Sequence, residues 1–85
     1  MPVRYVATFF SHFGATRFRR LCRERRVACW LAPVPRSLSS SCGTCAFFDE
    51  LPLVEGEAWA GEVEFVAEHD DATDAYRELY RAEGA

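Results

Sequence analysis

Short apolar runs and one amphipathic stretch make up the first half of the chain. Residues 3–9 are rich in β-branched and aromatic side chains, which predicts a strand. Ser11 then occupies a helix N-cap position, and helical spacing continues to about Arg26 in a stripe of four residues: Ala15, Phe18, Leu21 and Cys22. Residues 27–32 form a nearly continuous apolar run, which is typical of a strand buried on both faces. This order predicts a βαβ unit with parallel strands.

The second half of the chain is less regular. Residues 44–48 predict a third short strand, and residues 49–61, punctuated by Pro52 and two glycines, predict mainly loop. Residues 62–68 alternate between polar and apolar positions, which predicts a strand with one solvent-exposed face. Asp71 can cap a final helix whose apolar positions fit the helical template: Ala72, Ala75, Tyr76, Leu79 and Tyr80. We therefore expect a single α+β domain over residues 1–85, a two-layer sandwich of about four strands in a mixed sheet covered by two helices.

The charge of the chain is unevenly distributed. Residues 1–36 hold eight Arg and one acid, whereas residues 37–85 hold two Arg and twelve acids, and the net charge is −3. The two halves can meet within the fold or present a dipolar surface to an anionic partner, and the first is the simpler interpretation. The chain has no lysine, which excludes Schiff-base chemistry on a lysine side chain. No apolar run approaches ~20 residues, so we expect no membrane span, no signal peptide and a cytoplasmic protein.

The segment from Arg36 to Cys45 is the candidate reactive loop. It follows the apolar run at 27–32, and two prolines before Arg36 stiffen its entry. Around Cys42 it gathers one cation, several hydroxyls and a glycine that can adopt a positive φ: Arg36, Ser39, Ser40, Ser41, Gly43 and Thr44. Cations and hydrogen-bond donors favour a thiolate, which is the nucleophilic form of cysteine. We therefore expect Cys42 to be the reactive residue, against the alternative of a flexible polar linker that contains two cysteines.

The other candidate ligands and nucleophiles have simpler interpretations. Cys42 and Cys45 would face opposite sides of an extended strand, so a disulfide between them requires a turn at residues 43–44. Cys22 and Cys29 are interpreted as small core residues, and because they are far apart in the sequence they do not supply the second close pair of a zinc site. His12 follows the first strand and could lie near Cys42 as a base, although a solvated histidine is commoner in a first helical turn. We predict no metal site and no cofactor.

Residues 9–14 and 33–45 together carry a resemblance to a known family. A strand that ends in Thr-Phe-x-Ser, a helix, a second strand and then Pro-x-Pro-Arg…Ser-Ser-Ser-Cys-Gly resemble the putative Se/S carrier protein-like domains, which are short bacterial proteins. The resemblance covers roughly residues 3–48, and Cys42-Gly43 matches the core of its motif. It implies that Cys42 holds a persulfide or selenopersulfide and passes it to a partner enzyme.

Three functions follow as alternatives. The first is a sulfur or selenium carrier, a group-transfer protein rather than an independent enzyme, whose partners are donor and acceptor proteins and not nucleic acid or membrane. The second is a thiol–disulfide oxidoreductase or redox sensor that uses Cys42 and Cys45. The third is a metal-binding or purely interacting module.

Overall fold

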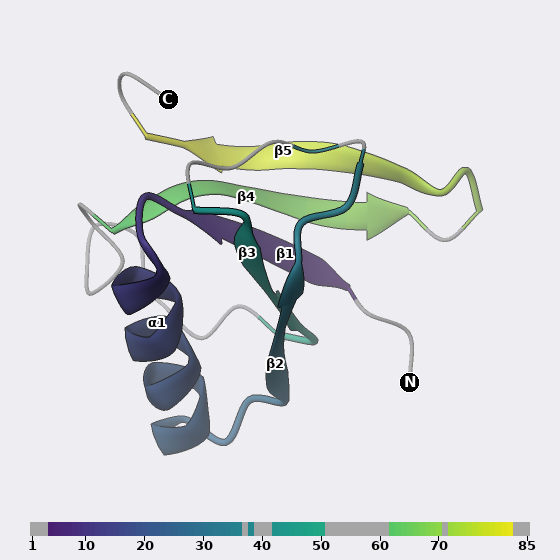
Figure 1. Ribbon diagram of the computed structural model, residues 1–85. Coiled ribbons are helices and arrows are strands. Elements are labelled where there is room, and N and C mark those ends of the chain that lie inside the picture. The colour runs from purple at the N-terminus through teal and green to yellow at the C-terminus, as the bar shows by residue number, and fades with distance from the viewer. Residues whose placement is uncertain (1–3, 37, 39–41, 51–61, 71, 83–85) are drawn as a thin grey trace.

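The computed structural model of the chain describes residues 4–36, 38, 42–50, 62–70 and 72–82. Within these ranges the elements are β1 (Tyr5–Phe9), α1 (His12–Glu24), β2 (Cys29–Pro33), β3 (Thr44–Phe48), β4 (Val63–Asp70) and β5 (Ala75–Arg81). The five strands form one sheet in the order β2-β3-β1-β4-β5, and α1 packs on one face of it (Figure 1). The α+β class is confirmed, but the mixed sheet and the second helix are wrong. Of the predicted loop at 49–61, residues 51–61 lie outside the described residues.

All neighbouring strands are antiparallel, because β3 lies between the two strands of the expected βαβ unit. β3 pairs antiparallel with β1, through Tyr5 opposite Phe48, and antiparallel with β2, through Cys29 opposite Phe48. β1 and β2 therefore run in the same direction, as a β-α-β order requires, but they do not pair with each other. The strand–helix–strand order of this region was predicted correctly, but the prediction that its two strands pair with each other was wrong.

The predicted final helix is instead β5, which forms a hairpin with β4. Asp70 Oδ1 accepts a hydrogen bond from Ala72 N at 2.9 Å, and Asp74 adopts a left-handed φ of 54°, so this segment turns before it can start a helix. Asp71, the expected cap, lies outside the described residues. Tyr76 and Tyr80 are four residues apart, a spacing that both a helix and a strand can place on one face. In β5 the register shifts opposite Val66 and Ala67, so the two tyrosines pack against opposite faces of the sheet.

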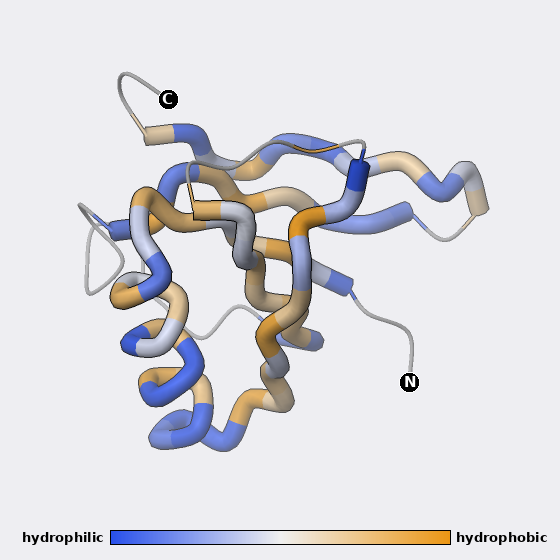
Figure 2. Tube along the Cα trace, viewed as in Figure 1, coloured by the Kyte–Doolittle hydropathy of each residue, from blue (hydrophilic) through white to orange (hydrophobic). Residues whose placement is uncertain are grey.

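Backbone hydrogen bonds fix both ends of helix α1, and the sequence predicts the first end better than the second. Ser11 Oγ accepts a hydrogen bond from Gly14 N at 3.3 Å, which confirms the N-cap. The helix ends at Glu24 rather than near Arg26, because Arg26 has a φ of 60° and Val27 N donates to Cys22 O at 2.8 Å. This pattern is a Schellman motif, which turns the chain back toward the sheet. The helix is amphipathic, with its apolar side turned toward the strands (Figure 2).

The sheet has a core on each face. The larger core lies under α1, where the Phe18 ring packs 5.4 Å from the Phe9 ring and 5.0 Å from the Phe48 ring, between centroids. The smaller core lies on the opposite face and consists of Val6, Cys45, Phe65 and Ala67. Burial of one phenylalanine side chain contributes roughly 2–3 kcal/mol to stability, so the aromatic cluster accounts for much of the attachment of α1 to the sheet.

Two strands have the opposite exposure to the one predicted. β2, expected to be buried on both faces, is an edge strand whose Trp30 remains 44% exposed. β4, expected to have a solvent-exposed face, lies between β1 and β5, and its residues 63–67 are all buried. A register shift beside Phe9 leaves Glu64 in a buried position, where its carboxylate accepts a hydrogen bond from the Thr8 hydroxyl at 3.2 Å.

Candidate functional site

Cys42 lies at the base of the hairpin that joins β2 to β3. The ladder between these strands runs from Cys29–Phe48 to Pro33–Thr44 and is extended by a hydrogen bond from Val34 N to Gly43 O at 3.2 Å. Gly43 has a φ of 76°, the left-handed conformation that its position after Cys42 suggested. The backbone between the two cysteines therefore turns at Gly43, and hydrogen bonds to the end of β2 hold it in place.

The two cysteines of the Cys-x-x-Cys segment pack against different faces of the sheet. Cys42 is half-buried, packs against the core under α1, and its Sγ donates to Thr44 O at 3.4 Å. Cys45 is fully buried in the opposite core, where its Sγ donates to Pro33 O at 3.6 Å. Burial raises the pKa of Cys45 to about 11, and Cys42 acts in the same direction. Cys45 is thus held as a neutral, inaccessible thiol, whereas Cys42 is partly open to solvent.

The loop before Cys42 is anchored by a residue that the sequence analysis did not single out. Leu38 N donates to Pro35 O at 3.0 Å, and the Leu38 side chain packs on the face opposite α1, where it lines a hollow with Phe65 and Tyr76. Arg36 is exposed in this turn, and Thr44 is half-buried as the first residue of β3. Ser39, Ser40 and Ser41 lie outside the described residues. The only signal for Leu38 in the sequence is that it is a lone apolar residue in a polar loop.

The N-terminus of α1 leaves the sheet at the same end as the Cys42 hairpin. Thr8 in β1 pairs with Cys45 in β3, so the end of β1 lies beside the start of β3. His12 is the exposed first residue of α1, and α1 lies on the face against which Cys42 packs. The register thus brings the β1–α1 junction and the Cys42 loop to one end and one face of the sheet, and a role of His12 at Cys42 stays a prediction. The first turn of α1 itself carries no acidic side chain, and Ser11 caps its backbone.

Two exposed phenylalanines flank His12 at this end of the molecule. Phe10 is 41% exposed and Phe13 is 67% exposed. The sequence analysis missed both, although Phe13 is out of phase with the buried stripe of Ala15, Phe18 and Cys22. That mismatch is the signal by which it could have been found.

The remaining two cysteines are in contact with each other. Cys22 is fully buried and Cys29 is half-buried, and their side chains are hydrogen-bonded. The expectation that they are small residues of the core agrees with their packing, but the inference that they are not a close pair is wrong. All four cysteines lie in the described part of the chain, and all are thiols. In that same part, no three His, Cys, Asp or Glu side chains converge as metal ligands.

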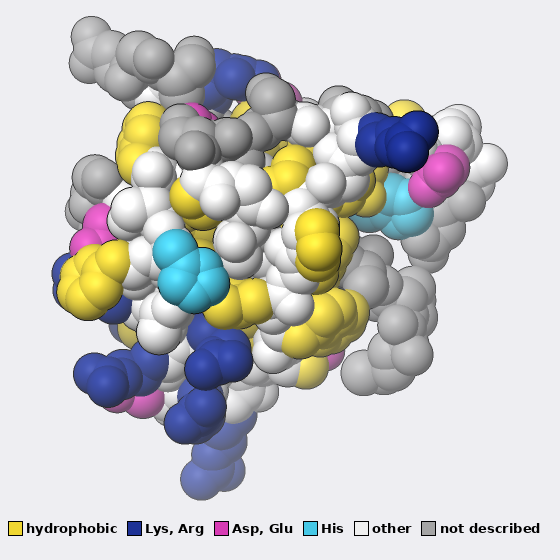
Figure 3. Space-filling view, viewed as in Figure 1, with side chains coloured by type: hydrophobic (Ala, Val, Ile, Leu, Met, Phe, Trp, Pro, Cys, Tyr) yellow, Lys and Arg dark blue, Asp and Glu magenta, His cyan; other side chains and the backbone are white. Residues whose placement is uncertain are grey.

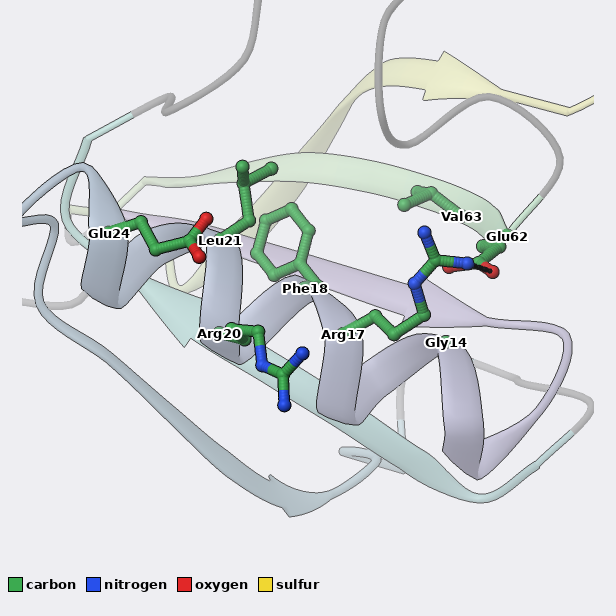
Figure 4. A pocket seen from close by; sticks show the side chains of 8 residues that line it. All are labelled: Gly14, Arg17, Phe18, Arg20, Leu21, Glu24, Glu62 and Val63. Atoms are coloured by element: carbon green, nitrogen blue, oxygen red, sulfur yellow. Dashed lines mark hydrogen bonds and ion pairs between the residues drawn. The ribbon is translucent and has the colours of Figure 1, made fainter.

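A cavity of about 180 Å³ lies elsewhere, between α1 and the start of β4 (Figure 4). Arg17 reaches across it to Glu62, with Nη1 at 2.6 Å from Oε1. Its lining contains none of the predicted site residues: Gly14, Arg17, Phe18, Arg20, Leu21, Glu24, Glu62 and Val63. The ion pair at this hollow links α1 to the residue that precedes β4.

The solvent-facing side of α1 is strongly basic. Arginine side chains gather over the lower end of the helix in Figure 3, and six of them are exposed: Arg17, Arg19, Arg20, Arg23, Arg25 and Arg26. No helix among the described residues is both long and apolar enough to cross a membrane. The arginines of α1 and of the turn that follows it therefore form a basic surface of the fold, and one of them, Arg17, pairs with Glu62 of the acidic half.

Comparison with known proteins places this fold and loop in a family. The model of the family described as Putative Se/S carrier protein-like matches residues 4–69, which is more than half of the 85-residue chain. The chain therefore belongs to this family, which confirms the resemblance inferred from the loop. The match extends past Phe48, where the resemblance was expected to end, and takes in residues 49–61. No curated protein and no solved structure gives a significant match to the chain.

Proposed function

We propose that the protein is a sulfur or selenium carrier that holds a persulfide or selenopersulfide on Cys42 and passes it to a partner protein. The observation that carries this proposal is the separation of the two loop cysteines. Cys42 is half-buried beside the loop of the family motif, whereas Cys45 is fully buried on the opposite face. A carrier needs one accessible nucleophile, and a dithiol oxidoreductase needs two thiols that meet.

The transfer is a pair of exchange reactions with no net redox change. The Cys42 thiolate attacks the terminal sulfur of a donor persulfide, a bond forms between Cys42 Sγ and that sulfur, and the donor cysteine leaves as a thiolate. In the second reaction an acceptor nucleophile attacks the terminal atom, and the Cys42 thiolate leaves. A terminal selenium follows the same two steps when the donor holds selenium at the same oxidation level.

The surroundings of Cys42 suit an anionic terminal atom. The N-terminus of α1 lies at the same end and face of the sheet, and backbone N–H groups at a helix N-terminus favour negative charge. In this proposal Arg36 adds a cation and Ser40 and Ser41 add hydroxyl donors, while His12 serves as a proton acceptor at the rim. In such a site the persulfide is covalently bonded to Cys42 alone, and the surrounding groups stabilise its negative charge.

The donor and acceptor proteins approach the end of the sheet that carries Cys42. Phe10 and Phe13 offer exposed aromatic side chains there, and exposed aromatic residues are common anchors of protein–protein contacts. The arginines of α1 favour partners whose contact surface is acidic. A reducing compartment such as the cytoplasm keeps Cys42 available as a thiol.

Loading of Cys42 can be measured by intact mass after incubation with a persulfide donor. We expect the wild type and Cys45→Ser to gain the mass of one sulfur atom, which dithiothreitol removes. Cys42→Ser should gain none in the loop, because the nucleophile is absent. Peptide mapping of the loaded protein locates the added atom.

A Thr73→Ala variant, at an exposed position in the turn between β4 and β5, keeps all four thiols and serves as the handling control. The proposal fails if the wild type never gains the extra atom. It also fails if Cys42→Ser and the wild type load the same loop peptide to the same extent.

A further inference from the structure

We propose that Cys22 and Cys29 form a second thiol site, a redox-active dithiol that peroxide converts to an intramolecular disulfide. This site is separate from the carrier loop and goes beyond the proposed function. Cys29 begins β2, whereas the Cys42 hairpin joins the other end of that strand. The two sites therefore occupy opposite ends of one edge strand.

The backbone between the two cysteines brings their side chains together. Val27 N donates to Cys22 O at 2.8 Å and Arg26 N donates to Arg23 O at 3.1 Å, which closes the end of α1 into a tight reversal. Asp49 N donates to Ala28 O at 3.3 Å, and Cys29 pairs with Phe48, so the returning strand is fixed to β3. Both cysteines pack in the core under α1, where their side chains are hydrogen-bonded. The contact is set by secondary structure on both sides and not by a flexible loop.

The environment gives the two thiols different roles. Cys29 is half-buried and open to a small oxidant, whereas Cys22 is fully buried behind it. The hydrogen bond from Cys22 lowers the pKa of Cys29, and the charge of Arg19 acts in the same direction against the effect of burial. The contact with Cys29, burial and the charge of Asp49 raise the pKa of Cys22. Cys29 is thus the attacking thiolate, and Cys22 is the neutral thiol that resolves the product.

The oxidation balances with hydrogen peroxide as the oxidant. The Cys29 thiolate attacks one peroxide oxygen, the O–O bond breaks, and Cys29 becomes a sulfenic acid as hydroxide leaves and takes up a proton to give water. Cys22 Sγ then attacks Cys29 Sγ, its proton passes to the departing hydroxyl, and a second water leaves. The two thiols are oxidised by two electrons in total, and one peroxide is reduced to two waters. The resulting bond joins the last turn of α1 to the edge strand.

The test uses the full chain with Cys42→Ser and Cys45→Ser, so that only the core cysteines remain. After brief treatment with limiting hydrogen peroxide, we expect the intact mass to fall by two hydrogen atoms. A non-reducing digest should contain the peptide of Cys22 linked to that of Cys29. Introducing either Cys22→Ala or Cys29→Ala should abolish both signals, and urea unfolding of each variant shows whether it is folded.

The proposal is overturned if Cys29 gains oxygen atoms without forming the linked peptide. It is equally overturned if the parent protein forms only dimers through intermolecular disulfides, or if its thiols resist peroxide that oxidises a free thiol in the same solution. Because Cys42 is absent from this protein, a negative result here leaves the carrier function standing. Conversely, a failure to load Cys42 with sulfur does not affect this result.

Discussion

The loop pair, Cys42 and Cys45, and the core pair, Cys22 and Cys29, reverse the usual relation between sequence spacing and proximity. The loop pair is three residues apart in the sequence, yet its members pack against opposite faces of the sheet. The core pair is seven residues apart, yet its side chains are hydrogen-bonded. A strand separates neighbouring side chains by its alternation, whereas a helix end followed by a tight reversal returns the chain to its own last turn. Proximity therefore follows the secondary structure between two residues.

The comparison also separates the chemistry of the two pairs. In each pair one thiol is fully buried and the other half-buried, so each has one sulfur open to reagents. In the core pair the buried thiol touches the open one and can resolve it. In the loop pair the buried thiol lies across the sheet and donates to the carbonyl of Pro33. Although each pair has one buried and one half-buried thiol, the core pair therefore favours a disulfide, whereas the loop pair favours a single nucleophile.

The largest expected effect is the difference in alkylation rate within each pair. In the folded, reduced protein, Cys42 and Cys29 should react with iodoacetamide at least about 100-fold faster than Cys45 and Cys22. The buried thiols react only after an opening that costs about 3 kcal/mol or more. Peptide mapping over a time course measures the four rates, and a denatured sample provides the unprotected reference. Equal rates at Cys42 and Cys45 would refute the assignment of the loop pair to opposite faces.

The second effect is the pH dependence of stability that buried Cys45 contributes. Its pKa rises from 9.0 to about 11 on folding, so the unfolded chain releases this proton first as the pH rises. The contribution is fully present below pH 9 and is lost between pH 9 and pH 11, by up to about 2–3 kcal/mol in the free energy of unfolding. Urea unfolding at several pH values should show a shallower decline in Cys45→Ala than in the wild type. Cys22 and Tyr76, whose pKa values are also raised, leave a residual slope in both proteins. Identical slopes would mean that Cys45 reaches solvent in the folded state.

Much of the local structure could be predicted from the sequence. The strand near residues 5–9, the cap at Ser11, the amphipathic helix and the turn at Gly43 all depend on nearest neighbours along the chain. The candidate loop was identified for the same reason, since its cation, cysteine and glycine all lie within residues 36–43.

What the sequence did not predict depends on which strands become neighbours. An apolar run at 27–32 suits a central strand, but the insertion of β3 beside β1 left β2 at the edge. The alternation at 62–68 suits a strand with one solvent-exposed face, but β4 lies between β1 and β5, and a core on each face of the sheet buries residues 63–67. The helical template at 72–80 failed because a spacing of four residues fits a helix and a regular strand equally well, and the turn at Asp74 decided between them. The contact between Cys22 and Cys29 was missed because Arg26, a residue without glycine's freedom, adopts the left-handed conformation that ends the helix.

The smallest of these effects concerns Gly43, the residue that turns the backbone between the members of the loop pair. Its φ of 76° is unfavourable for residues with a Cβ, yet among the described residues that do not adjoin it in the chain, a Cβ placed there would meet no atom within 4 Å. Gly43→Ala should therefore lower the free energy of unfolding by about 1–2 kcal/mol through backbone strain alone, without a steric clash. Gly43→Asn is the matched control, since asparagine tolerates this conformation and should lose less. Urea unfolding measures both variants. A loss that is equal in the two variants would point to the added side chain as the cause, and no loss in either would show that the turn at Gly43 does not require a positive φ in solution.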